Sequence, residues 1–191
     1  MELNNVENEM KNFLKTTALI TSVLATSGAI AATQGTVGAT STGTLDISVD
    51  VEDLVRISGL SDILLTFDVT GTGDIVGSST ACIYRNGAGN YTVNATGDGA
   101  ANAFTIQNAA PVPTPIAYTV AWDDAVTGTA AVGVTSGTPL AGQTGANTVS
   151  DDCSTGGGAN AFVEVTVPRA SLVAAPAGTY NGTLTLEIAP E

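Results

Sequence analysis

Two pairs of adjacent aspartates are candidates for a catalytic or metal-binding role in this chain. Asp123–Asp124 and Asp151–Asp152 could bind calcium or perform acid–base hydrolysis. Both pairs fall in expected loops, and neither has the spacing of a calcium loop or a third partner, so we favour solvated loop charge. The chain has no histidine, no Gly-x-Ser-x-Gly motif and no phosphate-binding glycine loop. We therefore expect no enzyme, no metal and no cofactor.

The first 31 residues have the features of a secretory signal peptide. Two lysines precede an apolar run over residues 16–30, and Ala29-Ile30-Ala31 has the small–x–small pattern of a cleavage site. We expect cleavage after Ala31. A membrane anchor is the less favoured interpretation, because a run of about 15 residues falls short of the ~20 that span a bilayer. Either Met1 or Met10 starts translation.

The chain has two cysteines, Cys82 and Cys153. Since an exported protein passes through an oxidising compartment, a disulfide between them is the default expectation. A catalytic thiol would need an activating histidine, and none is available. A disulfide that closes a loop this long stabilises a fold by roughly 4 kcal/mol. The pair is predicted to be structural.

Composition indicates an all-β protein. The 191 residues include 22 glycines and only 12% charged residues, and short alternating apolar runs are separated by turn residues. The formal net charge is −13. A surface this acidic repels the phosphate backbone of nucleic acids and the anionic headgroups of lipids. We therefore expect neither nucleic-acid binding nor membrane insertion.

Seven or eight strands are expected after residue 51, with no long helix. Their number and spacing predict an immunoglobulin-like Greek-key β-sandwich. A loop with one short strand near 131–134 is expected over 123–149, and a helical turn over 168–175. In the last strand Tyr180, Leu184, Leu186 and Ile188 face one way. The expected strands are 52–58, 63–70, 80–85, 90–96, 104–106, 116–122, 160–167 and 179–188.

Residues 43–51, which we call the leading segment, form the most regular alternation in the chain. Polar residues separate the four aliphatic side chains Leu45, Ile47, Val49 and Val51. In an extended chain one face is therefore aliphatic and the other polar, so the segment needs an apolar groove. The groove could lie in its own sandwich, with the segment as an ordinary first strand, or in another subunit. Residues 32–42 before it are small and polar and are expected to be flexible alone.

Four places in the sequence resemble one known family. They are Thr-Gly-Thr-Leu-Asp-Ile-Ser-Val over 42–49, Ala-Cys-Ile-Tyr-Arg-Asn-Gly over 81–87 with Gly89-Asn90-Tyr91, Cys153 before the strand 162–167, and Ala-Gly-Thr-Tyr-Asn-Gly-Thr-Leu-Thr-Leu over 177–186. Together they resemble the subunits of archaic chaperone–usher pili, which share a spore-coat-protein-U-like domain. The last of the four is the most specific.

The resemblance implies a sandwich that lacks its final strand and is completed by the leading segment of a neighbour. It implies three parts: a signal peptide over 1–31, an extension with the donor strand over 32–51, and a pilin domain over 52–191. Implied partners are identical or homologous subunits in a filament, with a periplasmic chaperone and an outer-membrane usher during assembly.

The family resemblance places the protein on the cell surface as a fimbrial shaft subunit for adhesion or biofilm formation. The shaft role follows from the chain's own donor segment and from a length too short for a separate receptor-binding domain. The alternative from a different class is a secreted monomeric β-sandwich that binds carbohydrate or matrix.

Overall fold

The computed structural model describes residues 32–110 and 113–191. Contacts divide the chain into two compact units, Met1–Asp50 and Val51–Glu191. The predicted signal peptide over 1–31 and its cleavage site lie outside the described residues. No helix among the described residues is long and apolar enough to cross a membrane.

The described part of the first unit contains a small hairpin. Thr33 and Thr44 exchange two backbone hydrogen bonds, with N···O distances of 2.8 and 3.0 Å. Gly35 allows the two arms to approach, since a Cβ built there would lie 2.1 Å from Ser41 Oγ. Residues 32–42, which were expected to be flexible alone, are thus closed into a hairpin by this pairing. Residues 45–50 belong to no strand or helix.

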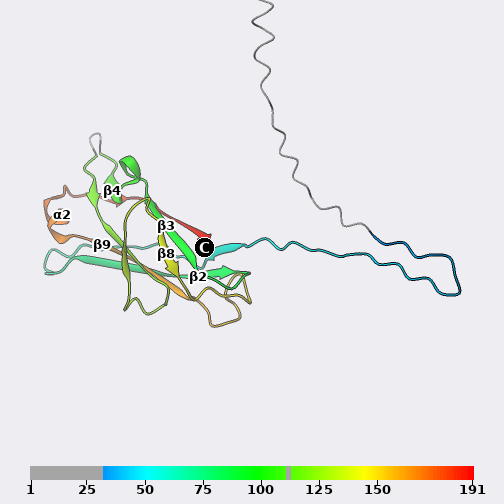
Figure 1. The fold of residues 1–191 in the computed structure, drawn as a ribbon. Coiled ribbons are helices and arrows are strands. Elements are labelled where there is room, and N and C mark those ends of the chain that lie inside the picture. The colour runs from blue at the N-terminus through cyan, green and yellow to red at the C-terminus, as the bar shows by residue number, and fades with distance from the viewer. Residues whose placement is uncertain (1–31, 111–112) are drawn as a thin grey trace, which may run out of the picture. The chain divides into compact units, whose positions relative to one another are not determined.

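The second unit contains a five-stranded antiparallel sheet (Figure 1). It is built from long alternating runs, of which β2 is the longest. In spatial order its strands are β1 (Val55–Ser58), β2 (Ile75–Arg85), β9 (Ala161–Val167), β6 (Thr119–Asp123) and β7 (Val132–Val134).

Two three-stranded sheets complete this unit. One has the order β11 (Leu184–Pro190), β3 (Tyr91–Gly97) and β8 (Leu140–Gln143), and the other has β10 (Tyr180–Asn181), β4 (Thr105–Asn108) and β5 (Ile116–Ala117). The short helices are η1 (Ala100–Asn102) and α2 (Arg169–Ala174).

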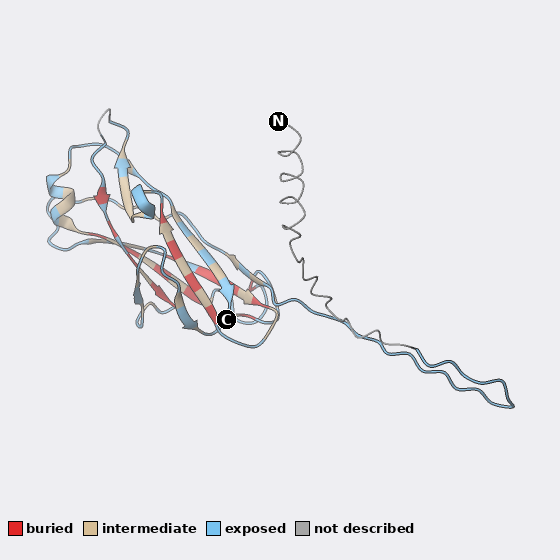
Figure 2. Cartoon of the chain, turned by 45° about the horizontal axis from the view of Figure 1, so that its top comes forward, coloured by how far each residue is buried: buried red, intermediate tan, exposed pale blue. Residues whose placement is uncertain are grey.

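The hydrophobic core lies between the sheets. β3 and β9 show strict alternation of buried and half-buried residues, which Figure 2 shows as alternating bands. Trp122 and Tyr91 are each 1% exposed and are the largest fully buried side chains. Valine and isoleucine of β2, β3, β6 and β9 fill the rest. The period-two pattern of the sequence therefore defines the core.

The prediction of an all-β immunoglobulin-like sandwich is confirmed. In that fold four strands form one sheet in the order A, B, E, D, and strands C, F and G form the other. The order β1-β2-β9-β6 reproduces the first sheet, and the pair β3-β11 reproduces C and F. The strand order, which spacing could not supply, is thus the Greek-key order.

Three strand predictions need correction. Residues 63–70 pair with no strand; the expected alternation of exposure holds over 63–67 and ends at Val69, which is 76% exposed. The run 116–122 is interrupted between β5 and β6, and the final run 179–188 is two strands. Tyr180 therefore lies on β10, beside β4, and not on the same strand as Leu184. The break falls where a Cβ on Gly182 would lie 2.7 Å from Thr105 O, because the chain crosses β4 closely there.

Two further predictions about loops were incomplete. The strand β8 lies inside the stretch predicted as loop, where glycines obscure its pattern. Asp123, predicted to be solvated, is 3% exposed. Its carboxylate accepts hydrogen bonds from the N–H groups of Ala125 and Ala130, at 3.1 and 3.2 Å. It closes the loop after β6, because a buried carboxylate needs such donors.

Candidate functional site

The last strand, β11, has a free edge. It pairs with β3 from Leu184↔Gly97 to Pro190↔Tyr91. No other described strand is hydrogen-bonded to β11, although β1 contacts it. Leu184, Leu186 and Ile188 are half-buried on its inner face. In the immunoglobulin order the position beside F belongs to strand G. In the described residues of this chain that position holds no strand.

The wall segment, residues 62–67, lies across from this edge. Ile63, Leu65 and Phe67 are half-buried, whereas Leu64 between them is 93% exposed. Among the described residues, no backbone N–H or C=O of the wall segment takes part in a hydrogen bond. It is an extended chain with the side-chain pattern of a strand and no partner strand.

An apolar groove with a volume of about 370 Å³ runs between the wall segment and β11. Its floor consists of valines of β9, with Ile106 and Tyr118 beside them, and its polar residues include Ser61, Asp62, Ser79 and Thr183. The full lining is Leu60, Ser61, Asp62, Ile63, Leu65, Ser79, Ile106, Tyr118, Val163, Val165, Val167, Gly182, Thr183, Leu184 and Leu186.

Both walls of the groove offer unpaired backbone groups. Every second residue of an antiparallel edge strand directs its N–H and C=O away from its only partner. The wall segment offers a second row. A single extended chain in the groove could therefore pair on both sides and bury alternate side chains against the floor. This arrangement is suited to binding a strand.

The aliphatic side chains of the leading segment are open to solvent. Leu45, Ile47 and Val49 are 69%, 89% and 85% exposed, and Val51 is 73% exposed. Scattered exposed apolar residues are normal, but four in strict alternation form a continuous apolar stripe. None of these residues belongs to a strand of the sheets.

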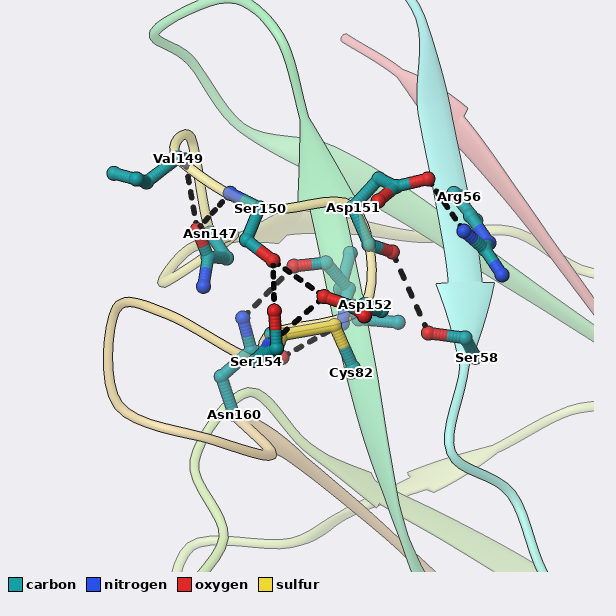
Figure 3. The surroundings of a disulfide bond; sticks show 12 residues. Arg56, Ser58, Cys82, Asn147, Val149, Ser150, Asp151, Asp152, Ser154 and Asn160 are labelled. Atoms are coloured by element: carbon teal, nitrogen blue, oxygen red, sulfur yellow. Dashed lines mark hydrogen bonds and ion pairs between the residues drawn. A yellow bond between two sulfur atoms is a disulfide. The ribbon is translucent and has the colours of Figure 1, made fainter.

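A disulfide joins Cys82 of β2 to Cys153, with the Cα atoms 5.8 Å apart (Figure 3). Nearby, the side chain of Asn160 pairs with the backbone of Ile83, accepting from its N–H at 2.7 Å and donating to its C=O at 2.8 Å. Cys153 has a φ of 55°, which few residues other than glycine adopt. The bridge holds this irregular loop against β2.

The predicted loop carboxylates Asp151 and Asp152 lie beside this disulfide (Figure 3). Asp151 pairs with Arg56 of β1, and both side chains are exposed. Hydrogen bonds from Ser150 and Ser154 hold the pKa of Asp152 well below its ordinary value. Among the described residues, no group of three or more cysteine and carboxylate side chains is placed to hold a metal. Asp151 therefore ties the loop to β1, and Asp152 is hydrogen-bonded within the loop.

Arg85 is a structural residue that the sequence did not single out. It is 4% exposed, and its guanidinium donates to the Asp53 carboxylate and to the C=O groups of Asn90 and Glu191. Next to it, Asn86 accepts from the Leu54 N–H at 2.7 Å. The start of the sandwich is thereby fixed to the β2–β3 turn. The only feature of the sequence that could have indicated this structural role is the rarity of arginine in so acidic a chain.

Comparison with known proteins gives a distant likeness. No family model and no curated protein matches the chain. Among solved structures, it is similar to a chain of a chaperone–tip adhesin complex of CFA/I fimbriae, with a TM-score of 0.45 and 16% identity over 72% of this chain and 42% of that one. The chain thus spans less than half the length of that neighbour. A likeness this distant says nothing of function, which must be inferred from the groove and the leading segment.

Proposed function

We propose that this chain is a structural subunit of a surface fibre, and that its leading segment fills the groove of the next subunit. The observation that carries the proposal is the match between an open apolar groove with unpaired backbone on both walls and an exposed, strictly alternating strand sequence on the same chain. Strand addition to an exposed edge is an established binding mode.

The energy available from such insertion is large. Burying the four aliphatic side chains of the leading segment is worth ~1.5–3 kcal/mol each, or roughly 6–12 kcal/mol together. That equals the stability of many whole domains. Hydrogen bonds to both walls would add to it. A joint of this kind would hold a filament together without covalent bonds.

Insertion into a neighbour is favoured over insertion into the chain's own groove. Residues 52–54 are fixed at Asn86, where the Asn86 N–H donates to Leu54 O at 3.1 Å. If the leading segment folded back in a hairpin centred on Glu52, Leu45 would lie opposite Gly59, and no aliphatic residue of the segment would reach further along the chain. The groove begins at Leu60, and β1 contacts β11 before it. The segment would therefore fall short of the groove.

A contact in which one end of a subunit enters the groove of the next does not close on itself, so it generates an open filament. The family resemblance supplies the remaining partners: a periplasmic chaperone that covers the groove before assembly, and an outer-membrane usher. On this proposal the protein is an exported shaft pilin of a chaperone–usher fimbria, on the cell surface, for adhesion or biofilm formation.

The test compares two charges introduced on opposite faces of the leading segment. Ile47→Asp puts a carboxylate into an apolar groove and should abolish fibres seen by negative-stain electron microscopy. Ser48→Asp, the matched control, puts the same charge on the polar face and should leave fibres intact. Equal assembly of the two variants would contradict the proposal, as would a wild-type chain that remains a stable monomer.

A further inference from the structure

Arg169, the first residue of α2, reaches across to the end of the wall segment. Its Nη1 donates to Asp68 O at 2.9 Å, and its Nη2 donates to Val69 O at 2.6 Å. Its guanidinium carbon lies 5.1 Å from the centre of the Phe67 ring. The backbone N–H of Arg169 in turn donates to Asp74 Oδ1 at 2.9 Å. One side chain therefore contacts three consecutive residues at this end.

The opposite end of the wall segment is fixed separately. The N–H of Ser61 donates to the Ser79 hydroxyl at 2.9 Å, and Ser79 is buried in β2. Between these two attachments no described backbone group of the wall segment is hydrogen-bonded. Its backbone is held by hydrogen bonds at both ends and is unpaired along its length, where Ile63 and Leu65 pack against the core.

The use of Arg169 is unusual for so acidic a chain. Only three arginines follow residue 31. Arg56 and Arg85 each pair with a carboxylate, whereas among the described residues Arg169 forms no ion pair and donates to two backbone carbonyls. A planar guanidinium with two separate donor nitrogens can hold two adjacent carbonyls at once, which an ammonium cannot do as well.

We propose that Arg169 is a positioning residue that fixes the wall segment at the distance from β11 which an incoming strand requires. This inference rests on the proposed function. A wall that is already ordered does not lose further conformational entropy when a strand pairs with it. A wall released at the Arg169 end would have to be ordered during binding, so strand capture would be slower and weaker.

The experiment measures binding of a fluorescent peptide with the sequence of residues 43–51 to the full chain carrying Ile47→Asp, whose own leading segment cannot occupy a groove. Arg169→Ala should weaken binding about tenfold, mainly through the association rate. Arg169→Lys should give an intermediate loss, because it keeps the charge near Phe67. Arg56→Ala, a control arginine outside the groove, should bind as the parent does.

A second readout separates positioning from general stability. In the peptide-free chain, amide exchange in residues 62–67 should quicken in Arg169→Ala, while exchange in β2 and β9 stays as in the parent. If Arg169→Ala fails to fold, peptide binding and amide exchange are measured on Arg169→Lys instead. If Arg169→Ala binds the peptide as tightly as Arg56→Ala does, Arg169 has no positioning role, and the proposal that the groove binds a strand is unaffected. A parent that binds no peptide would overturn the proposed function and this inference together.

Discussion

Gly77 of β2 and Leu65 of the wall segment approach so closely that no side chain fits between them. A Cβ built on Gly77 would lie 2.5 Å from Leu65 Cδ2 and 2.5 Å from Ile63 Cγ2. Glycine inside a strand weakens it, and it commonly marks close approach of another chain segment. Here it lets the two apolar side chains of the wall segment lie on β2, and this contact sets the position of one side of the groove.

Gly77→Val should therefore displace the wall segment. The added side chain should cost ~1–3 kcal/mol of stability, as overpacking does, and should reduce fibre yield in electron micrographs. Gly133→Val in β7 is the matched control, since a Cβ at Gly133 meets nothing within 4 Å. Fibre yield that is the same for both variants would show that the position of the wall segment does not matter for assembly.

The ion pair between Asp53 and Arg85 gives a dependence on pH. Hydrogen bonds from Arg85 lower the pKa of Asp53 below its ordinary value of 3.8. A carboxyl whose pKa is lowered by folding stabilises the fold above its unfolded pKa and loses this effect as the pH falls through the folded value. The unfolding temperature of Asp53→Asn should thus lie below that of wild type at neutral pH, and the gap should narrow below pH 3.8. A gap that stays constant down to acid denaturation would contradict the assignment.

The disulfide between Cys82 and Cys153 should be structural. Its cysteines are 71 residues apart, and a loop of that size corresponds to roughly 4 kcal/mol in the chain-entropy model. The double variant Cys82→Ser, Cys153→Ser should lose about that much unfolding free energy in a urea titration. Wild type titrated under a reducing agent should unfold at the same urea concentration as the double variant. A variant as stable as oxidised wild type would show that the contacts of Asn160 and the Arg56–Asp151 pair hold the loop without the disulfide.

The sequence predicted the strands whose apolar residues alternate and are buried. β3 and β9 fall close to their expected positions, and β11 covers the second half of its expected run, because period-two alternation records burial on one face. The same reasoning failed at residues 63–70, since alternation reports which side chains are buried and not whether the backbone is paired. The wall segment is half-buried on one face like a strand, yet its backbone pairs with no strand.

Of the candidate site, the sequence revealed the leading segment but not the groove. Its walls come from residues 60–65 and 182–186, far apart in the chain, and only the fold brings them together. Arg85 and Arg169 were missed for a related reason. Arg169 acts through backbone carbonyls, which carry no sequence pattern. Arg85 contacts carbonyls and the carboxylate of Asp53, which is distant in sequence and is brought to it by the fold. Asp123 was misjudged because burial of a loop carboxylate depends on N–H donors that the fold supplies.

A cryo-electron microscopy structure of the fibre, with the chain traced continuously through residues 43–60, would show which subunit fills the groove. We expect the strand beside Leu184 and Leu186, facing Ile63 and Leu65, to be residues 45–51 of the neighbouring subunit. A groove filled by the subunit's own chain, or a fibre in which Leu45, Ile47 and Val49 remain in solvent, would contradict this expectation.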